Sequence, residues 1–158
     1  MDSAESFPNH ILTINLGTPV NVLAKIGEKT YEGFIKTGAL SIIPANLLSE
    51  WYWKQSQETN VLHIYIKPTF LYDLASSSDI NPERIEILSS YKNFDSKIKH
   101  IGLALRAELE SGCPAGRLFA ESLATALGIH LIKQYSTSTQ TLRKYGGGFT
   151  KASITSSN

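Results

Sequence analysis

The segment that decides the fold reads Gly38-Ala-Leu-Ser-Ile-Ile-Pro44-Ala-Asn-Leu-Leu-Ser49-Glu-Trp-Tyr-Trp53. Gly38 predicts a turn into an apolar strand, because glycine and proline are the strongest breaks in regular structure. Pro44 then ends that strand, a short loop follows, and an aromatic-rich strand begins at Trp51. Short strands separated by such turns are typical of a β-sandwich or a β-barrel.

The rest of the first half of the chain continues this pattern. Further strands, each bounded by Gly, Pro or polar residues, are predicted over 10–16, 20–26, 30–35 and 61–66. The last of them alternates cleanly, because successive side chains of a strand point to opposite faces. One of its faces carries Leu62, Ile64 and Ile66, and the other carries His63 and Tyr65. We therefore expect a β-barrel over about residues 8–70.

The second half of the chain changes to a helical period. Asp95 or Ser96 is a predicted N-cap, and Ser111-Gly112 ends the helix that follows. A second helix is predicted from about Ala115 to Tyr135, and apolar or small residues cover most of its circumference. The sequence thus predicts an α+β fold, mainly β, in which two long antiparallel helices make up a helical part over 71–135.

The segment from Gly38 to Ser49 resembles the cupin frame, which runs glycine, five residues, proline, one residue, glycine, two residues, histidine. Here the first glycine and the proline are in place, but Asn46 replaces the second glycine. Ser49 stands where cupins have a metal-binding histidine. The resemblance implies a cupin-like, jelly-roll-type β-barrel, and the missing histidine argues against a metalloenzyme.

The order of these parts resembles the N-terminal sensor domain of AraC-type transcription regulators. The likeness runs from about His10 to the tail, and its most specific segment is Arg117-Leu-Phe-Ala-Glu-Ser-Leu-Ala-Thr-Ala-Leu-Gly-Ile-His-Leu. In such regulators a cupin-like barrel binds a small effector, the helices after it carry dimer contacts, and a separate domain reads DNA. The resemblance implies that the chain is a ligand-sensing and dimerisation domain.

Domain boundaries follow from the same likeness. Residues 1–135 are expected to form a single sensor domain, and the Ser-, Thr- and Gly-rich residues 136–158 a flexible linker or tail. That tail is too short for two helix-turn-helix units, which need roughly 100 residues. We therefore expect DNA contact only through a domain that is absent from this chain. The chain itself is expected to be either an excised fragment or a natural truncation.

Aromatic residues on the predicted strands are the candidate lining of an effector pocket. Ligand pockets are mostly apolar with a few placed polar groups. The candidates are Trp51, Trp53, His63, Tyr65, Tyr31 and His10. The alternative is that these side chains only pack the barrel. The composition suits a flat organic molecule and a sugar equally well.

The two predicted helices are the candidate dimer interface. The small residues of 120–128 permit a close helix approach, to a second copy or to the barrel of the same chain. The sequence predicts a homodimer through these helices. The candidate contact residues are Leu105, Leu109, Leu123, Ala124, Leu127 and Leu131.

No metal, cofactor or catalytic residue is predicted. The His-x-His pair of cupin metal sites is missing, although His10, His63 and Glu50 remain an open combination. Cys113 precedes a helix, but no sequence pattern supplies a base for it. Two alternatives to a sensor remain: a small cupin enzyme, such as a metal-dependent isomerase or dioxygenase, and a purely structural dimerisation module with a filled barrel.

Charge and composition indicate an ordinary cytoplasmic domain. The net charge of +1 does not favour a nucleic-acid surface, and 42% hydrophobic residues can form a sizeable core. The single cysteine fits a reducing compartment, and the first residues lack the features of a signal peptide. The longest apolar run, Leu123 to Ile132, is too short to span a bilayer, so no membrane partner is expected.

Overall fold

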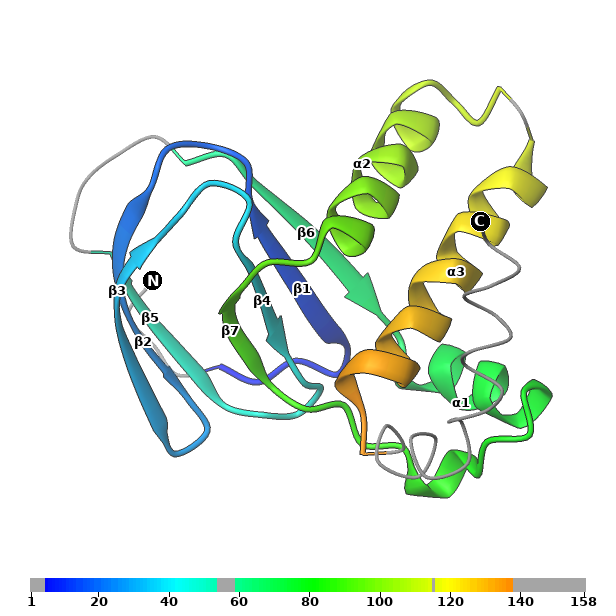
Figure 1. Ribbon diagram of the computed structural model, residues 1–158, viewed down its shortest axis with the longest axis horizontal. Coiled ribbons are helices and arrows are strands. Elements are labelled where there is room, and N and C mark those ends of the chain that lie inside the picture. The colour runs from blue at the N-terminus through cyan, green and yellow to red at the C-terminus, as the bar shows by residue number, and fades with distance from the viewer. Residues whose placement is uncertain (1–4, 54–58, 115, 138–158) are drawn as a thin grey trace, which may run out of the picture.

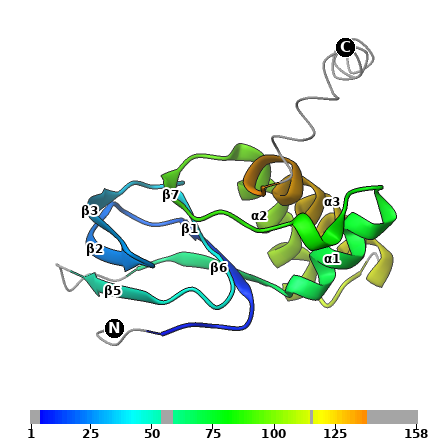
Figure 2. The same cartoon turned by 90° about the horizontal axis from the view of Figure 1, so that it is seen from below.

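The computed structural model describes residues 5–53, 59–114 and 116–137, which form three layers (Figures 1 and 2). Two antiparallel sheets face each other, and helices cover the outer face of one of them. The four-stranded sheet has the order β6-β1-β4-β7 and the three-stranded sheet the order β3-β2-β5. The strands are β1 (His10–Asn15), β2 (Val20–Ile26), β3 (Lys29–Ile35), β4 (Leu40–Ile43), β5 (Ser49–Trp53), β6 (Val61–Ile66) and β7 (Ser90–Asn93).

The predicted α+β class is confirmed in this form, as two sheets with helices. Within the described ranges no ladder joins the two sheets, and no closed barrel is seen. Most of the predicted tail, residues 138–158, lies outside the described residues. Among the described helices, none is both long enough and apolar enough to cross a membrane.

Strand alternation places a different core on each face of the four-stranded sheet. On β1, Leu12 and Ile14 point toward the helices, whereas Ile11 lies in the core between the sheets. The predicted alternation of β6 is confirmed in the same way, with Leu62 and Ile66 on the helical side. The helix-side core is completed by Leu40, Ile42, Leu71, Ala75, Ile87, Ile98, Leu127, Leu131 and Ile132.

The helical layer consists of α1 (Pro68–Ser77), α2 (Ser96–Glu110) and α3 (Arg117–Tyr135), with a short 3₁₀ turn over Pro82–Arg84. The last two pack together as an antiparallel hairpin, as predicted (Figure 1). Gly128 of α3 lies directly against Leu74 and Phe70 of α1, where a β-carbon would find no room. Gly128 therefore serves a contact inside the chain.

A hydrogen-bonded cluster around Asp95 ties the helical layer to β7. Asp95 caps α2 as predicted, since its Oδ1 accepts from the Ile98 N–H at 3.0 Å. Its Oδ2 accepts from the Tyr135 hydroxyl at 2.7 Å and lies 2.8 Å from His130 Nε2. Asn93, the last residue of β7, donates to the Tyr135 oxygen at 3.1 Å. One carboxylate thus joins the start of α2 to the end of α3.

Candidate functional site

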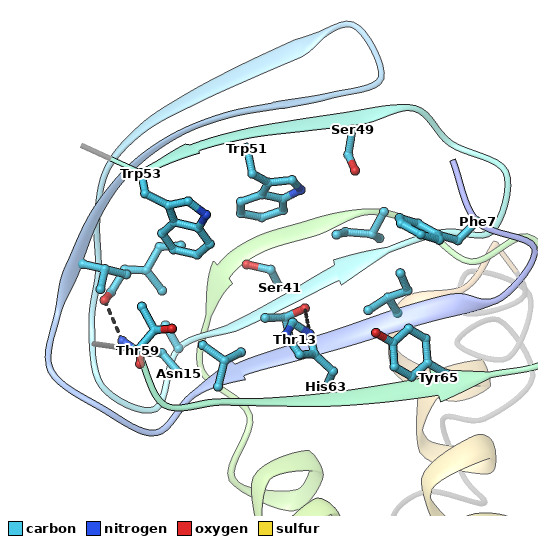
Figure 3. Close-up of a pocket in the computed structure, with 16 residues that line it drawn as sticks. Phe7, Thr13, Asn15, Ser41, Ser49, Trp51, Trp53, Thr59, His63 and Tyr65 are labelled. Atoms are coloured by element: carbon cyan, nitrogen blue, oxygen red, sulfur yellow. Dashed lines mark hydrogen bonds between the residues drawn. The ribbon is translucent and has the colours of Figure 1, made fainter. Parts of the chain in front are cut away.

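A cavity of about 430 Å³ lies between the two sheets (Figure 3). We call the four-stranded sheet its floor and the three-stranded sheet its roof. β1, β4 and β6 supply the floor, and β5 supplies the indole rings of Trp51 and Trp53 on the roof. Phe7, which precedes β1, lines one end, where the Asn46 N–H donates to its carbonyl at 2.7 Å.

Aromatic rings connect the sheets on the side of β3 and β7. Tyr31 of β3 and Tyr91 of β7 stack with ring centroids 4.4 Å apart, and Tyr91 also lies 6.0 Å from the Trp51 ring. The Tyr91 hydroxyl is buried, and the described residues offer it no hydrogen-bond partner. Its burial, together with the neighbouring Tyr31, raises the pKa of Tyr91 to about 12. Aromatic packing therefore makes this side apolar and holds the sheets together.

The opposite side of the cavity lies between β5 and β6. Each is an edge strand of a different sheet, and the two do not pair with each other. The lining side chains on this side are the exposed ones: Trp53 is 43% exposed and Tyr65 60% exposed, whereas Trp51 is only 7% exposed. The centroids of the two indole rings lie 6.5 Å apart, with 24° between their planes. An aromatic wall thus runs from the opening to the interior.

Few polar groups reach the cavity, and they sit mainly on its floor. Thr13 Oγ1 lies 3.4 Å from His63 Nδ1 (Figure 3). Burial lowers the pKa of His63 below its ordinary value, which favours the neutral form of the imidazole. The buried Asn15 amide is already used: it donates to the Thr18 and Ile35 carbonyls and accepts from the Gly17 N–H. No Asp, Glu, Lys or Arg is found among the described residues that line the cavity.

The structure brings together four of the six residues predicted for an effector pocket. Trp51, Trp53, His63 and Tyr65 all line the cavity. Tyr31 stands behind this lining, in the stack with Tyr91. His10 lies elsewhere, where its Nδ1 accepts from the Ala45 N–H at 2.9 Å.

Sequence reasoning missed the other lining residues, among them Phe7, Thr13 and Ser41. Thr13 alternates with the buried Leu12 and Ile14, and Ser41 alternates with Leu40 and Ile42, so the faces they occupy were visible. The register that sets Thr13 beside Ser41 could not be predicted from the sequence.

Metal binding finds no support in the geometry of the described residues. In those ranges no three His, Cys, Asp or Glu side chains lie close enough together to hold an ion. Ser49, at the position of the cupin histidine, lines the cavity from the roof. Its backbone pairs with that of Glu5, ahead of β1.

The residues predicted for a dimer interface divide into two groups. Leu127 and Leu131 are buried in the chain's own core between sheet and helices, which leaves them little surface for contact with a second subunit. Leu109 is 63% exposed, and Leu105, Leu123 and Ala124 are half-buried. A second hollow, of about 600 Å³, lies between β6 and the three helices, and Leu105, Leu109 and Ala124 line it.

Comparison with known sequences gives no assignment: no protein-family model matches the chain, and no curated protein does. The cavity must therefore be interpreted from its own chemistry.

Proposed function

We propose that this chain binds a small organic effector between its two sheets. The observation that carries the proposal is the cavity of about 430 Å³, apolar for the most part, with a few polar groups on one wall. Small-molecule sites share these properties and have volumes of about 300–1,000 Å³. A purely structural module would fill this space with its own side chains, so the open cavity counts against that alternative.

The proposal extends to the role of a sensor in an AraC-type transcription regulator. Its support is the sequence resemblance together with the order of the parts, strands first and a helical hairpin afterwards. In this interpretation the two facing sheets are a cupin-like, jelly-roll-type unit that acts in the cytoplasm. DNA reading would belong to a separate domain.

Dimerisation is the second part of the proposal. Leu118 and Phe119 near the start of α3 and Leu109 near the end of α2 are large apolar side chains left exposed. Exposed apolar groups that gather on one surface mark interaction sites. A homodimer through this end of the hairpin would cover them, and the interface would be isologous.

Contacts between the cavity and the end of α3 offer a route for signalling. Trp51 touches Tyr91 on β7, and Asn93 on the same strand donates to Tyr135 at the end of α3. An effector can shift this assembly only if it binds one arrangement of β7 more tightly than another.

Native mass spectrometry of the purified chain tests the proposal. We expect a dimer that retains a small organic molecule or takes one up from a mixture. One equivalent of iron, manganese or zinc per chain would instead favour a cupin enzyme. A chain that never takes up a small molecule would contradict the sensor.

A further inference from the structure

A row of three polar side chains crosses the floor of the cavity. Thr13 of β1 stands directly opposite His63 of β6 on one side and Ser41 of β4 on the other. Neighbouring strands lie about 4.8 Å apart, so the three groups form a line at right angles to the strands. All three face the cavity (Figure 3).

Apolar groups flank this polar row on one side. The next cross-strand row consists of Tyr65, Ile11 and Ile43, of which only tyrosine carries a polar atom. On the other side, Asn15 pairs with Val61, and the Asn15 amide is taken up by backbone groups. On the floor, the row therefore supplies most of the available hydrogen-bonding groups, and Tyr65 adds one hydroxyl beside it.

The groups of the row retain hydrogen-bonding capacity. The Lys92 N–H donates to Ser41 Oγ at 3.5 Å, which leaves the serine O–H to donate in turn. His63 shares Nδ1 with Thr13 and can still use Nε2, as a donor or an acceptor according to its tautomer. The row can thus serve oxygens that accept and hydroxyls that donate.

We propose that the cavity takes an uncharged, flat, largely apolar molecule that sets hydroxyl or carbonyl oxygens on one edge against the row of His63, Thr13 and Ser41. This inference rests on the proposed function, and it specifies the class of effector. The molecule lies with its ring against Trp51 and Trp53 and its polar edge on the floor.

Charged and highly hydroxylated molecules fit this lining poorly. A carboxylate or an ammonium group would lose water without gaining a partner charge from the lining residues that the structure describes. A sugar carries hydroxyls around its whole ring, and those that face Ile11 or Ile43 would be buried unpaired. A compact ring system with one polar edge buries neither an unpaired charge nor an unpaired hydroxyl.

Calorimetric titration of the full chain at pH 7.5 tests the class. The probes are 2-naphthalenemethanol, 2-naphthoate, 2-naphthalenemethylamine and glucose, of which the first three share one ring system and differ in charge. We expect the alcohol to bind at least about tenfold more tightly than each of the other probes. A tenfold ratio of affinities corresponds to a difference of about 1.4 kcal/mol in binding free energy. Equal or tighter binding of a charged probe or of glucose would overturn the proposed class and leave the proposed function standing. Failure of all four to bind would contradict the proposed function itself.

The row itself is tested by Thr13→Val, which keeps the shape of the side chain and removes its hydroxyl. We expect the affinity for 2-naphthalenemethanol to fall roughly fivefold, the loss of one hydrogen bond, with no change for 2-methylnaphthalene. The ratio of the two affinities does not depend on any change in stability. Thr69→Val, at an exposed position on α1, is the matched control. If Thr13→Val leaves the ratio of the two affinities unchanged, the row does not bind the hydroxyl group of the ligand.

Discussion

Trp51 and Trp53 belong to the same wall of the cavity but differ in what holds them. Trp51 is part of the core between the sheets and touches Tyr91, so its loss would damage the fold as well as the site. Trp53 is 43% exposed and contributes mainly to the wall. The two residues therefore have to be tested differently.

Trp53→Ala should weaken the binding of 2-naphthalenemethanol by about three- to tenfold, because an aromatic contact is worth roughly 0.5–1.5 kcal/mol beyond its buried area. The melting temperature should change little, since the side chain is partly exposed. Calorimetric titration and thermal unfolding measure the two quantities. Tyr52→Ala, on the same strand but outside the cavity lining, is the control and should bind like the wild type. Equal affinity in Trp53→Ala would exclude Trp53 from the site.

At the residue scale, alternation within a strand was enough to predict part of the cavity lining. It correctly paired His63 with Tyr65 and Trp51 with Trp53. It failed for Thr13, because a single polar residue in an apolar strand has no significance until its cross-strand neighbours are known. Register between strands distant in sequence is set by the whole sheet.

Among the elements, α2 and α3 depend on Asp95 for their joint position. Burial raises the pKa of Asp95, but hydrogen bonds from Tyr135, His130 and the Ile98 N–H, together with the charge of His130, hold that pKa below its usual range. The ionised carboxylate therefore stabilises the folded state. This contribution is present above the ordinary Asp pKa of about 3.9 and is lost as the pH falls through the lowered folded-state pKa.

Asp95→Asn should lower the free energy of unfolding by about 1–3 kcal/mol near pH 7, because hydrogen bonds to a charged acceptor are lost while the cap remains possible. Urea unfolding at a series of pH values gives the difference between wild type and variant. We expect the difference to shrink as the pH falls through the lowered folded-state pKa of Asp95, where the wild-type carboxylate also takes up a proton. A difference that stays constant with pH would show that the charge of Asp95 does not stabilise the fold.

Gly128 sets the distance between α1 and α3. Gly128→Ala should destabilise the chain by about 1–3 kcal/mol, since the added methyl group would overlap the Leu74 side chain and overpack the contact. Ser122→Ala, at an exposed position of the same helix, should stay within about 0.5 kcal/mol of wild type. Urea denaturation measures both. A stabilised Gly128→Ala would mean that the gain in helix propensity exceeds the cost of overpacking.

Elements with a clear hydrophobic pattern were predicted from the sequence, and elements with a weak pattern were not. The two long helices and six of the strands follow from hydrophobic spacing and turn residues. β7, Ser-Tyr-Lys-Asn, carries almost no strand signal and exists because β4 provides a partner. Sequence patterns assigned ranges only to the two long helices, yet Pro68 starts a further helix, α1, that packs on α3.

For the whole molecule, the hairpin of α2 and α3 decides whether the chain pairs with a second copy. Leu109→Arg should give a folded monomer in analytical ultracentrifugation, because Leu109 is exposed and adds little to the core. Leu127→Ala is the matched contrast: it should lower the free energy of unfolding by about 2–5 kcal/mol and leave the subunit count unchanged. A dimer that persists in Leu109→Arg would move the interface elsewhere.

The whole fold was predictable as a class and less so as an arrangement. Strands followed by helices implied an α+β domain, and apolar faces implied a shared core. The sequence did not reveal that β1 and β4 have two buried faces, one toward the helices and one toward a cavity. That outcome depends on how three separate layers stack, which no local pattern encodes.

The central claim is that a small uncharged molecule binds between the two sheets. The most direct measurement is the set of intermolecular nuclear Overhauser effects between 2-naphthalenemethanol and the labelled protein. We predict contacts from the naphthalene protons to the indole rings of Trp51 and Trp53 and to the Thr13 methyl group. Contacts confined to Leu105 and Leu109 in the hollow between β6 and the helices would contradict this account.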